Sequence, residues 1–86
     1  MNEKSLSKLL NHVLLKKYPD LDSIIVKFVD LDRNMFIIET TVVAKSDSDS
    51  RSRIFKEFGQ IKEDIKDLAS LMELSVANFS LSSRDN

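Results

Sequence analysis

The chain has 86 residues, of which 42% are hydrophobic and 31% charged, and its formal net charge is −1. This composition is typical of one small globular domain, and the charge argues against bulk electrostatic binding to nucleic acid. The sequence contains no cysteine, which excludes disulfides, cysteine-ligated metals and thiol catalysis. We therefore expect a single cytoplasmic domain over residues 1–86, with 82–86 as a frayed tail and without a membrane-spanning segment.

The first predicted element is an amphipathic helix over residues 4–17. Its apolar residues recur at the spacing of one helix face; they are Leu6, Leu9, Leu10, Val13 and Leu14. Lys16 and Lys17 suit the negative end of the helix dipole. Pro19 ends the helix because the residue before a proline is pushed out of the helical region.

Two β-strands follow, at residues 23–30 and 34–45, and a turn at 31–34 joins them into a hairpin. The first strand is rich in β-branched residues, and turn-forming residues flank it on both sides. Side chains alternate between the two faces of a strand. We expect one face to pack against the helices, and its residues are Ile24, Val26, Phe28, Phe36, Ile38, Thr40, Val42 and Ala44.

The opposite face of the hairpin is more apolar than a solvated sheet face normally is. An antiparallel sheet with one face in water usually shows polar residues on that face. Here the residues are Ile25, Val29, Met35, Ile37 and Val43. We expect a partner protein or a second copy of the chain to cover them.

A long amphipathic helix over residues 51–74 is the element around which we expect the fold to be organised. Its apolar stripe has the helical period; the stripe is Ile54, Phe58, Ile61, Ile65, Leu68 and Met72. The serine- and aspartate-rich segment 46–52 precedes it and is typical of a helix start. Asp47, Ser48, Asp49 and Ser50 are equal candidates for the N-cap.

After this helix the apolar pattern changes from the helical period to a period of two. Ala77, Phe79 and Leu81 alternate with more polar residues, which predicts a short third strand within 75–82. Whether this strand joins the sheet of the hairpin is left open by the sequence.

The predicted order is helix, strand, strand, helix and strand. We expect a two-layer α+β fold in which an antiparallel hairpin packs against a short N-terminal helix and a long C-terminal helix. This order resembles that of a type II KH domain lacking one helix. The GxxG loop of that family is absent, because the only glycine begins the segment Gly59-Gln60-Ile61-Lys62. We therefore assign no family.

Two candidate metal or catalytic sites lack residues that their chemistry requires. His12 is the only histidine and lies on the polar side of the first helix, without a second ligand or an orienting group. The segment 30–34 has the opening spacing of a calcium loop, but Met35 stands where that loop needs glycine. A surface histidine and a plain hairpin turn are the simpler interpretations.

Two further polar clusters have ordinary structural interpretations. Glu63, Asp64 and Asp67 alternate with lysines on the polar side of the long helix, which is typical of a solvated helix face. The serines of segment 46–52 are candidates for phosphorylation or for anion binding, but helix capping alone explains them. We therefore expect no catalytic residues, no metal and no cofactor.

Our main functional hypothesis is a non-enzymatic interaction or assembly module. It self-associates through the apolar sheet face or the long helix, with a dimer as the simplest assembly, and another protein remains open as partner. The alternative is a small RNA- or ribosome-associated protein that uses the first helix. Residues 1–17 carry four lysines and one glutamate, a balance of +3; the candidate contacts are Lys8, His12, Lys16 and Lys17.

Overall fold

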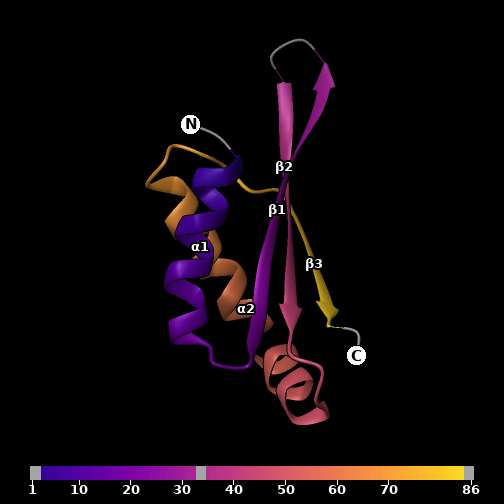
Figure 1. Ribbon diagram of the computed structural model, residues 1–86. Helices are drawn as coiled ribbons and strands as arrows, with labels where there is room; N and C mark the ends of the chain where they lie inside the picture. Colours follow the sequence, from indigo (N-terminus) through magenta and orange to yellow (C-terminus); the bar gives the residue numbers. More distant parts are fainter. Residues whose placement is uncertain (1–2, 33–34, 85–86) are drawn as a thin grey trace.

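The chain folds as a three-stranded mixed sheet packed against two helices, and this confirms the predicted α+β fold. The computed structural model describes residues 3–32 and 35–84. The elements are α1 (Glu3–Lys17), β1 (Leu21–Asp32), β2 (Met35–Ala44), α2 (Ser48–Ser70) and β3 (Asn78–Ser83), as labelled in Figure 1. The strand order is β1-β2-β3, with β1 antiparallel and β3 parallel to β2. The third strand therefore belongs to the sheet of the hairpin, and α2 is the crossover that parallel pairing requires.

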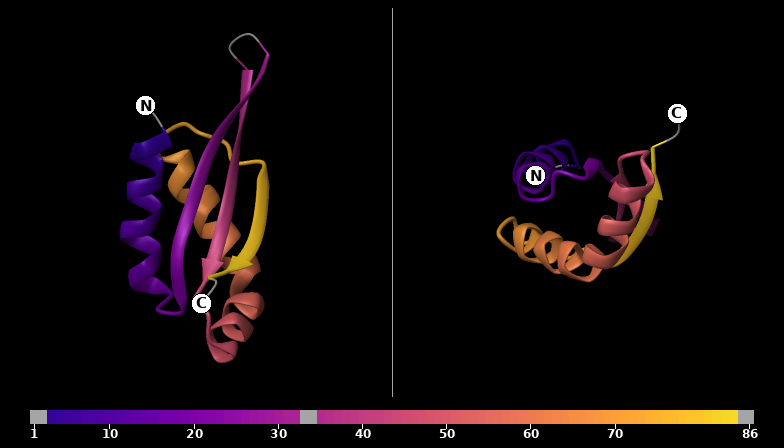
Figure 2. Two further views of the ribbon diagram at one scale, coloured as in Figure 1. Left: turned by 45° about the vertical axis from the view of Figure 1, so that its right-hand side comes forward. Right: turned by 90° about the horizontal axis from the view of Figure 1, so that it is seen from below.

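Both helices lie on the same side of the sheet, and the core fills the space between the two layers (Figure 2). α1 and α2 each contribute one fully buried stripe, which consists of Leu6, Leu10, Leu14, Ile54, Ile61 and Ile65. Ile24, Ile38 and Val42 bury their side chains from the sheet. Complete burial of one such side chain contributes about 1.5–3 kcal/mol, so these residues hold the two layers together.

α2 begins earlier and ends earlier than its apolar stripe predicts. Asp47 is the N-cap, and its carboxylate accepts the backbone N–H of Ser50 at 2.9 Å, so the helix starts at Ser48. It ends at Ser70, and the chain turns before it reaches Glu73, which has a positive φ of 59°. The stripe continues past the helix because Met72 still packs against the core from this turn.

The ends of the strands also differ from their predicted positions. β1 extends to Asp32, so residues 31–32 of the predicted turn belong to the strand, while 33–34 lie outside the described residues. β3 includes residues 82–83 of the predicted tail, and Arg84 continues in contact with the sheet through its N–H, which donates to Ala44 O at 2.9 Å. Residues 85–86 lie outside the described part of the chain.

The hairpin is too long for the helices to cover. β1 has 12 residues, which span about 40 Å at roughly 3.3 Å per residue. α1 has 15 residues, but a helix rises only about 1.5 Å per residue, so it spans about 22 Å. α2 is longer, with 23 residues, but it lies toward the other end of the sheet, so the turn end of the hairpin projects beyond both helices (Figure 1). The prediction that Phe36 packs inward is wrong for this reason, and its side chain is 43% exposed.

Two side chains of α1 cover the free edge of β1. Asn11 acts like a neighbouring strand, because its Nδ2 donates to Ile24 O at 2.9 Å and its Oδ1 accepts the Ile24 N–H at 2.8 Å. At the N-terminal end of α1, a carboxylate oxygen of Glu3 accepts the Phe28 N–H at 2.8 Å. An open strand edge can pair with other chains, so these bonds block β1 as far as Phe28.

We predict that Asn11→Ala destabilises the protein. The substitution removes both hydrogen bonds to Ile24, and each such bond is worth about 0.5–1.5 kcal/mol, so the free energy of unfolding should fall by about 1–3 kcal/mol. Urea denaturation measures this change. His12→Ala, at the exposed neighbouring position, is the matched control and should leave the midpoint within error. Equal midpoints for both variants would contradict the role of Asn11.

Candidate functional site

A polar cluster around Asp20 holds the start of α2 in place. The Asp20 carboxylate accepts hydrogen bonds from Arg53 Nε at 2.7 Å and Nη2 at 2.8 Å, and from the Ser50 hydroxyl at 2.9 Å. The Arg53 guanidinium, with the Ser50 hydroxyl, lowers the pKa of Asp20 to about 2. These contacts, together with the Asp47 cap, give the 46–52 segment a structural role.

A second polar cluster joins α1 to α2 and corrects one interpretation of the sequence. The Asp64 carboxylate is mostly buried; it accepts the Tyr18 hydroxyl at 2.6 Å and Lys17 Nζ at 2.8 Å. Burial opposes its ionisation, but these bonds and one from Gln60 outweigh that effect and lower the pKa of Asp64. Burial, with the hydrogen bond to this carboxylate, raises the pKa of Tyr18. Asp64 is therefore an interhelical brace, whereas the sequence pattern placed it on a solvated face.

The described residues contain no arrangement suited to metal binding. Over residues 3–32 and 35–84, no group of three or more histidine, aspartate and glutamate side chains could hold a metal ion. His12 is exposed on α1. The calcium-like segment 30–34 ends in residues that are outside the described part of the chain. Within the same ranges, neither helix combines the length and the apolar character that crossing a membrane requires.

The structure divides the five predicted interface residues among three environments. Ile25 and Met35 are 55% and 65% exposed, and Val29 and Ile37, which pair across the two strands, are half-buried. Val43 is only 8% exposed. It faces Ser23 of β1 on one side and Ser82 of β3 on the other.

An ion pair joins β1 to the residue after β3, at the end of the sheet that holds Val43. Arg84 follows β3 and Asp22 belongs to β1, yet Arg84 Nη1 lies 3.1 Å from Asp22 Oδ1. Because β2 separates these two strands, the pair must pass over the end of β2. Val43 itself is buried within its own chain and offers little surface to a partner.

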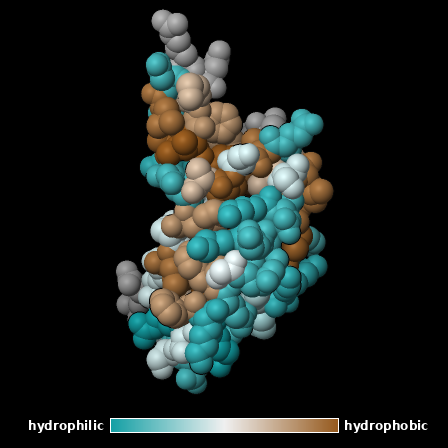
Figure 3. Space-filling view, turned by 180° about the vertical axis from the view of Figure 1, so that it is seen from behind, coloured by the Kyte–Doolittle hydropathy of each residue, from teal (hydrophilic) through white to brown (hydrophobic). Residues whose placement is uncertain are grey.

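Several exposed apolar side chains gather at the projecting end of the hairpin, residues 28–32 and 35–37, which we call the hairpin arm; Ile25, Phe55 and Leu71 are exposed elsewhere. Leu31 and Met35 are 57% and 65% exposed, and neither helix reaches them. On the helix side of the arm, the rings of Phe28 and Phe36 stack with centroids 5.0 Å apart and an interplanar angle of 16°. Figure 3 shows apolar side chains covering the arm and continuing as a band beside the largely hydrophilic surface of α2. The arm is thus apolar on both faces.

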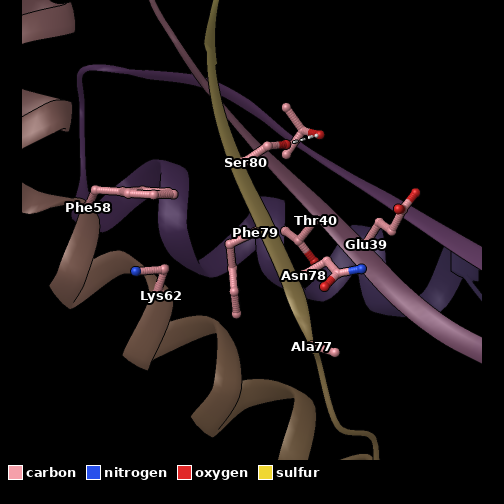
Figure 4. Close-up of a pocket in the computed structure, with 9 residues that line it drawn as sticks. Glu39, Thr40, Phe58, Lys62, Ala77, Asn78, Phe79 and Ser80 are labelled. Atoms are coloured by element: carbon pink, nitrogen blue, oxygen red, sulfur yellow. Dashed lines mark hydrogen bonds between the residues drawn. The ribbon is translucent and has the colours of Figure 1, made fainter.

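A groove of about 600 Å³ lies between α2 and β3, with β2 at its base (Figure 4). Phe58 and Lys62 line it from α2, and Phe79 lines it from β3. The Lys62 ammonium lies 5.0 Å from the centre of the Phe58 ring. Thr40 lies at the base, and its buried hydroxyl has no hydrogen-bond partner among the described residues. The groove therefore combines aromatic walls with a cation, and the exposed carboxylate of Glu39 also lines it.

The groove is the feature that sequence reasoning missed. The sequence predicts Phe58 in the helix stripe and Phe79 in the third strand, but it leaves open whether that strand joins the sheet. Only the parallel pairing of β3 with β2 brings Phe79 opposite α2. Polar residues alternate with apolar ones in 78–83, and this pattern indicates a strand at the edge of the sheet.

The candidate nucleic-acid contacts on α1 are only partly free. Lys8, His12 and Lys16 are exposed, as their positions on the polar face predict. Lys17 is held in the interhelical ion pair with Asp64. A surface that binds single-stranded nucleic acid usually combines cations with exposed aromatic side chains, and no aromatic residue lies among Lys8, His12 and Lys16 on α1.

Comparisons of the chain with protein-family models, with curated proteins and with solved structures find no match.

We predict that the Asp20 cluster gives the protein an acid-sensitive component of stability. An unfolded aspartate has a pKa of about 3.9, and Asp20 has a pKa of about 2 in the folded protein. Because the folded value is lower, this stabilisation is complete above the unfolded pKa and is lost as the pH falls through the folded value. Asp20→Asn should therefore lower the melting temperature at neutral pH and reduce the fall in stability between about pH 4 and 2.

Thermal unfolding across this pH range tests the prediction. Asp67→Asn, at an exposed position of α2, controls for the loss of one negative charge. If Asp20→Asn kept the full acid dependence of the natural protein, the Arg53 pair would not be its source.

Proposed function

We propose that this protein is a non-enzymatic assembly module of the cytoplasm that self-associates through the hairpin arm. One observation carries the proposal: Leu31, Met35 and Phe36 are large, apolar and exposed at an end of the sheet that no helix covers. Scattered exposed apolar residues are common on protein surfaces, whereas a contiguous group indicates an interaction site.

The physical properties of a two-stranded ribbon support a partner for the arm. An isolated hairpin is marginally stable in water, and it needs a third strand or a packed face to become stable. Over residues 28–32 and 35–37 the arm has no third strand within its own chain, and of its apolar side chains only Phe28 packs against the core. Covering one of its exposed side chains contributes about 1.5–3 kcal/mol, so several together offset much of the entropy cost of association.

A second copy is the simplest partner, because a homo-oligomer covers the same surface on every chain. Residues on α1 give no comparable support to nucleic-acid binding, since one of the four candidate contacts is already paired with Asp64. The polar clusters around Asp20 and Asp64 are explained by the packing of the helices, and no described cluster calls for an enzymatic role.

We predict that the natural protein forms a concentration-dependent oligomer and that Met35→Glu shifts it toward the monomer. The substitution places a charge in the proposed contact, while the high exposure of Met35 means that the fold itself loses little. Sedimentation velocity and light scattering over a concentration series measure the assembly.

Leu71→Glu is the matched control, because Leu71 is 77% exposed and lies outside the arm. This variant should assemble like the natural protein. A natural protein that stays monomeric up to the highest soluble concentration would refute self-association.

A further inference from the structure

We infer that the hairpin arm of one copy docks in the groove between α2 and β3 of a second copy. This inference rests on the proposed self-association and adds the surface that receives the arm. Strand edges, apolar contacts and charge each support the pairing independently.

The outer edge of β3 is open to another strand. Arg84 N–H donates to Ala44 O, so alternate residues of β3 direct their backbone groups toward β2. The backbone groups of Phe79, Leu81 and Ser83 then point away from the sheet. Among the hydrogen bonds of the described chain outside the ladder, none reaches these three residues. β3 also lacks the charged residues with which monomeric proteins commonly protect an edge.

The arm brings a matching edge. Asn11 and Glu3 block β1 only as far as Phe28, so the part of β1 that belongs to the arm has no helix beside it. An extended segment that adds to an open edge gains main-chain hydrogen bonds, while its side chains enter neighbouring pockets. The Phe28–Phe36 stack of the arm would then meet the aromatic walls of the groove, Phe58 and Phe79.

The arm and the groove each offer a charged group that can pair with the other, although the exposed Glu39 also lines the groove beside Lys62. The arm carries Asp30 and Asp32, both exposed and both without an ion pair to any residue of 3–32 or 35–84. Asp30 pairs in register with Phe36, which puts it on the side of the arm that carries the aromatic stack. The groove presents Lys62, which has no carboxylate within ion-pair distance among the same residues.

A second cation strengthens this complementarity. Lys66 Nζ lies 5.8 Å from the ring centre of Phe79 and 3.5 Å from a Glu63 carboxylate oxygen, so part of its charge is already compensated. Lys62 is therefore the main counterpart for the arm. An aspartate that enters beside it gains an opposite charge at a surface that also buries apolar area.

Charge reversal with mixing tests the inference. In Asp30→Lys two lysines face each other at the proposed contact, and in Lys62→Asp two aspartates do, so each variant alone should associate at least about tenfold more weakly than the natural protein. In an equimolar mixture of the two variants, a contact between unlike copies pairs residue 30 of one copy with an oppositely charged residue 62 of the other. The mixture should recover the assembly of the natural protein, and so should a chain that carries both substitutions.

Two controls separate charge effects from folding. Lys56→Asp and Asp67→Lys make equal changes at exposed positions of α2 outside the groove, and they should assemble like the natural protein. Circular dichroism melts show whether each variant is folded. Asp30→Asn and Lys62→Gln, which remove charge without reversing it, replace any reversed variant that fails to fold and should weaken assembly by a smaller factor.

The outcomes distinguish this inference from the proposed function. If the natural protein assembles but neither reversal weakens it, or if the mixed variants stay apart, the arm does not dock in this groove while self-association stands. Assembly lost in Asp30→Lys but not in Lys62→Asp points to a different acceptor surface and also overturns the inference. If the natural protein is monomeric, both the docking of the arm and the proposed self-association are refuted.

Discussion

The difference in rise between a strand and a helix governs this structure. A strand gains length about twice as fast as a helix for the same number of residues, so a 12-residue strand beside a 15-residue helix must extend past it. The part of the sheet before Phe28 in β1, with the residues of β2 and β3 beside it, packs two helices on one face. The part of the hairpin beyond Phe28 is a two-stranded ribbon that no helix covers. The proposed function follows from this geometry, because Leu31, Met35 and Phe36 are left uncovered together at one end of the sheet. Ile25, Phe55 and Leu71 are also exposed, but they lie outside the arm.

The polar interactions hold the covered part together and leave the arm alone. Asp20 ties the start of α2 to the α1–β1 turn, and Asp64 ties the middle of α2 to the end of α1. Asn11 occupies the place that a fourth strand would take beside Ile24. The groove is different: Thr40 has a buried hydroxyl without a described partner, and Lys62 has no ion pair with any residue of 3–32 or 35–84. Both groups are therefore available to the partner that we propose.

Local periodicity predicted the kind and order of all five elements, because a helical stripe and a strand alternation are encoded by neighbouring residues. It failed where contacts between distant segments decide. Phe36 follows the inward alternation but extends beyond the helices, and Asp64 follows the polar side of α2 yet meets Tyr18, 46 residues earlier. The groove depends on the parallel pairing of β3, for which no residue in 75–82 is diagnostic. Val43 has the apolar character of an interface residue, but only 8% of it is exposed in the single chain.

The register of the sheet sets a direction for any assembly built from it. β3 pairs only with residues 39–44 of β2, whereas the free edge of the arm belongs to residues 29–32 of β1, which pair with 35–37 at the other end of β2. The two unprotected stretches of edge therefore lie at different heights on the molecule. Copies that join through them are displaced along the strand axis, so each sheet is offset from the next instead of aligned with it. Such an offset keeps the long uninterrupted edges typical of aggregating sheets from forming.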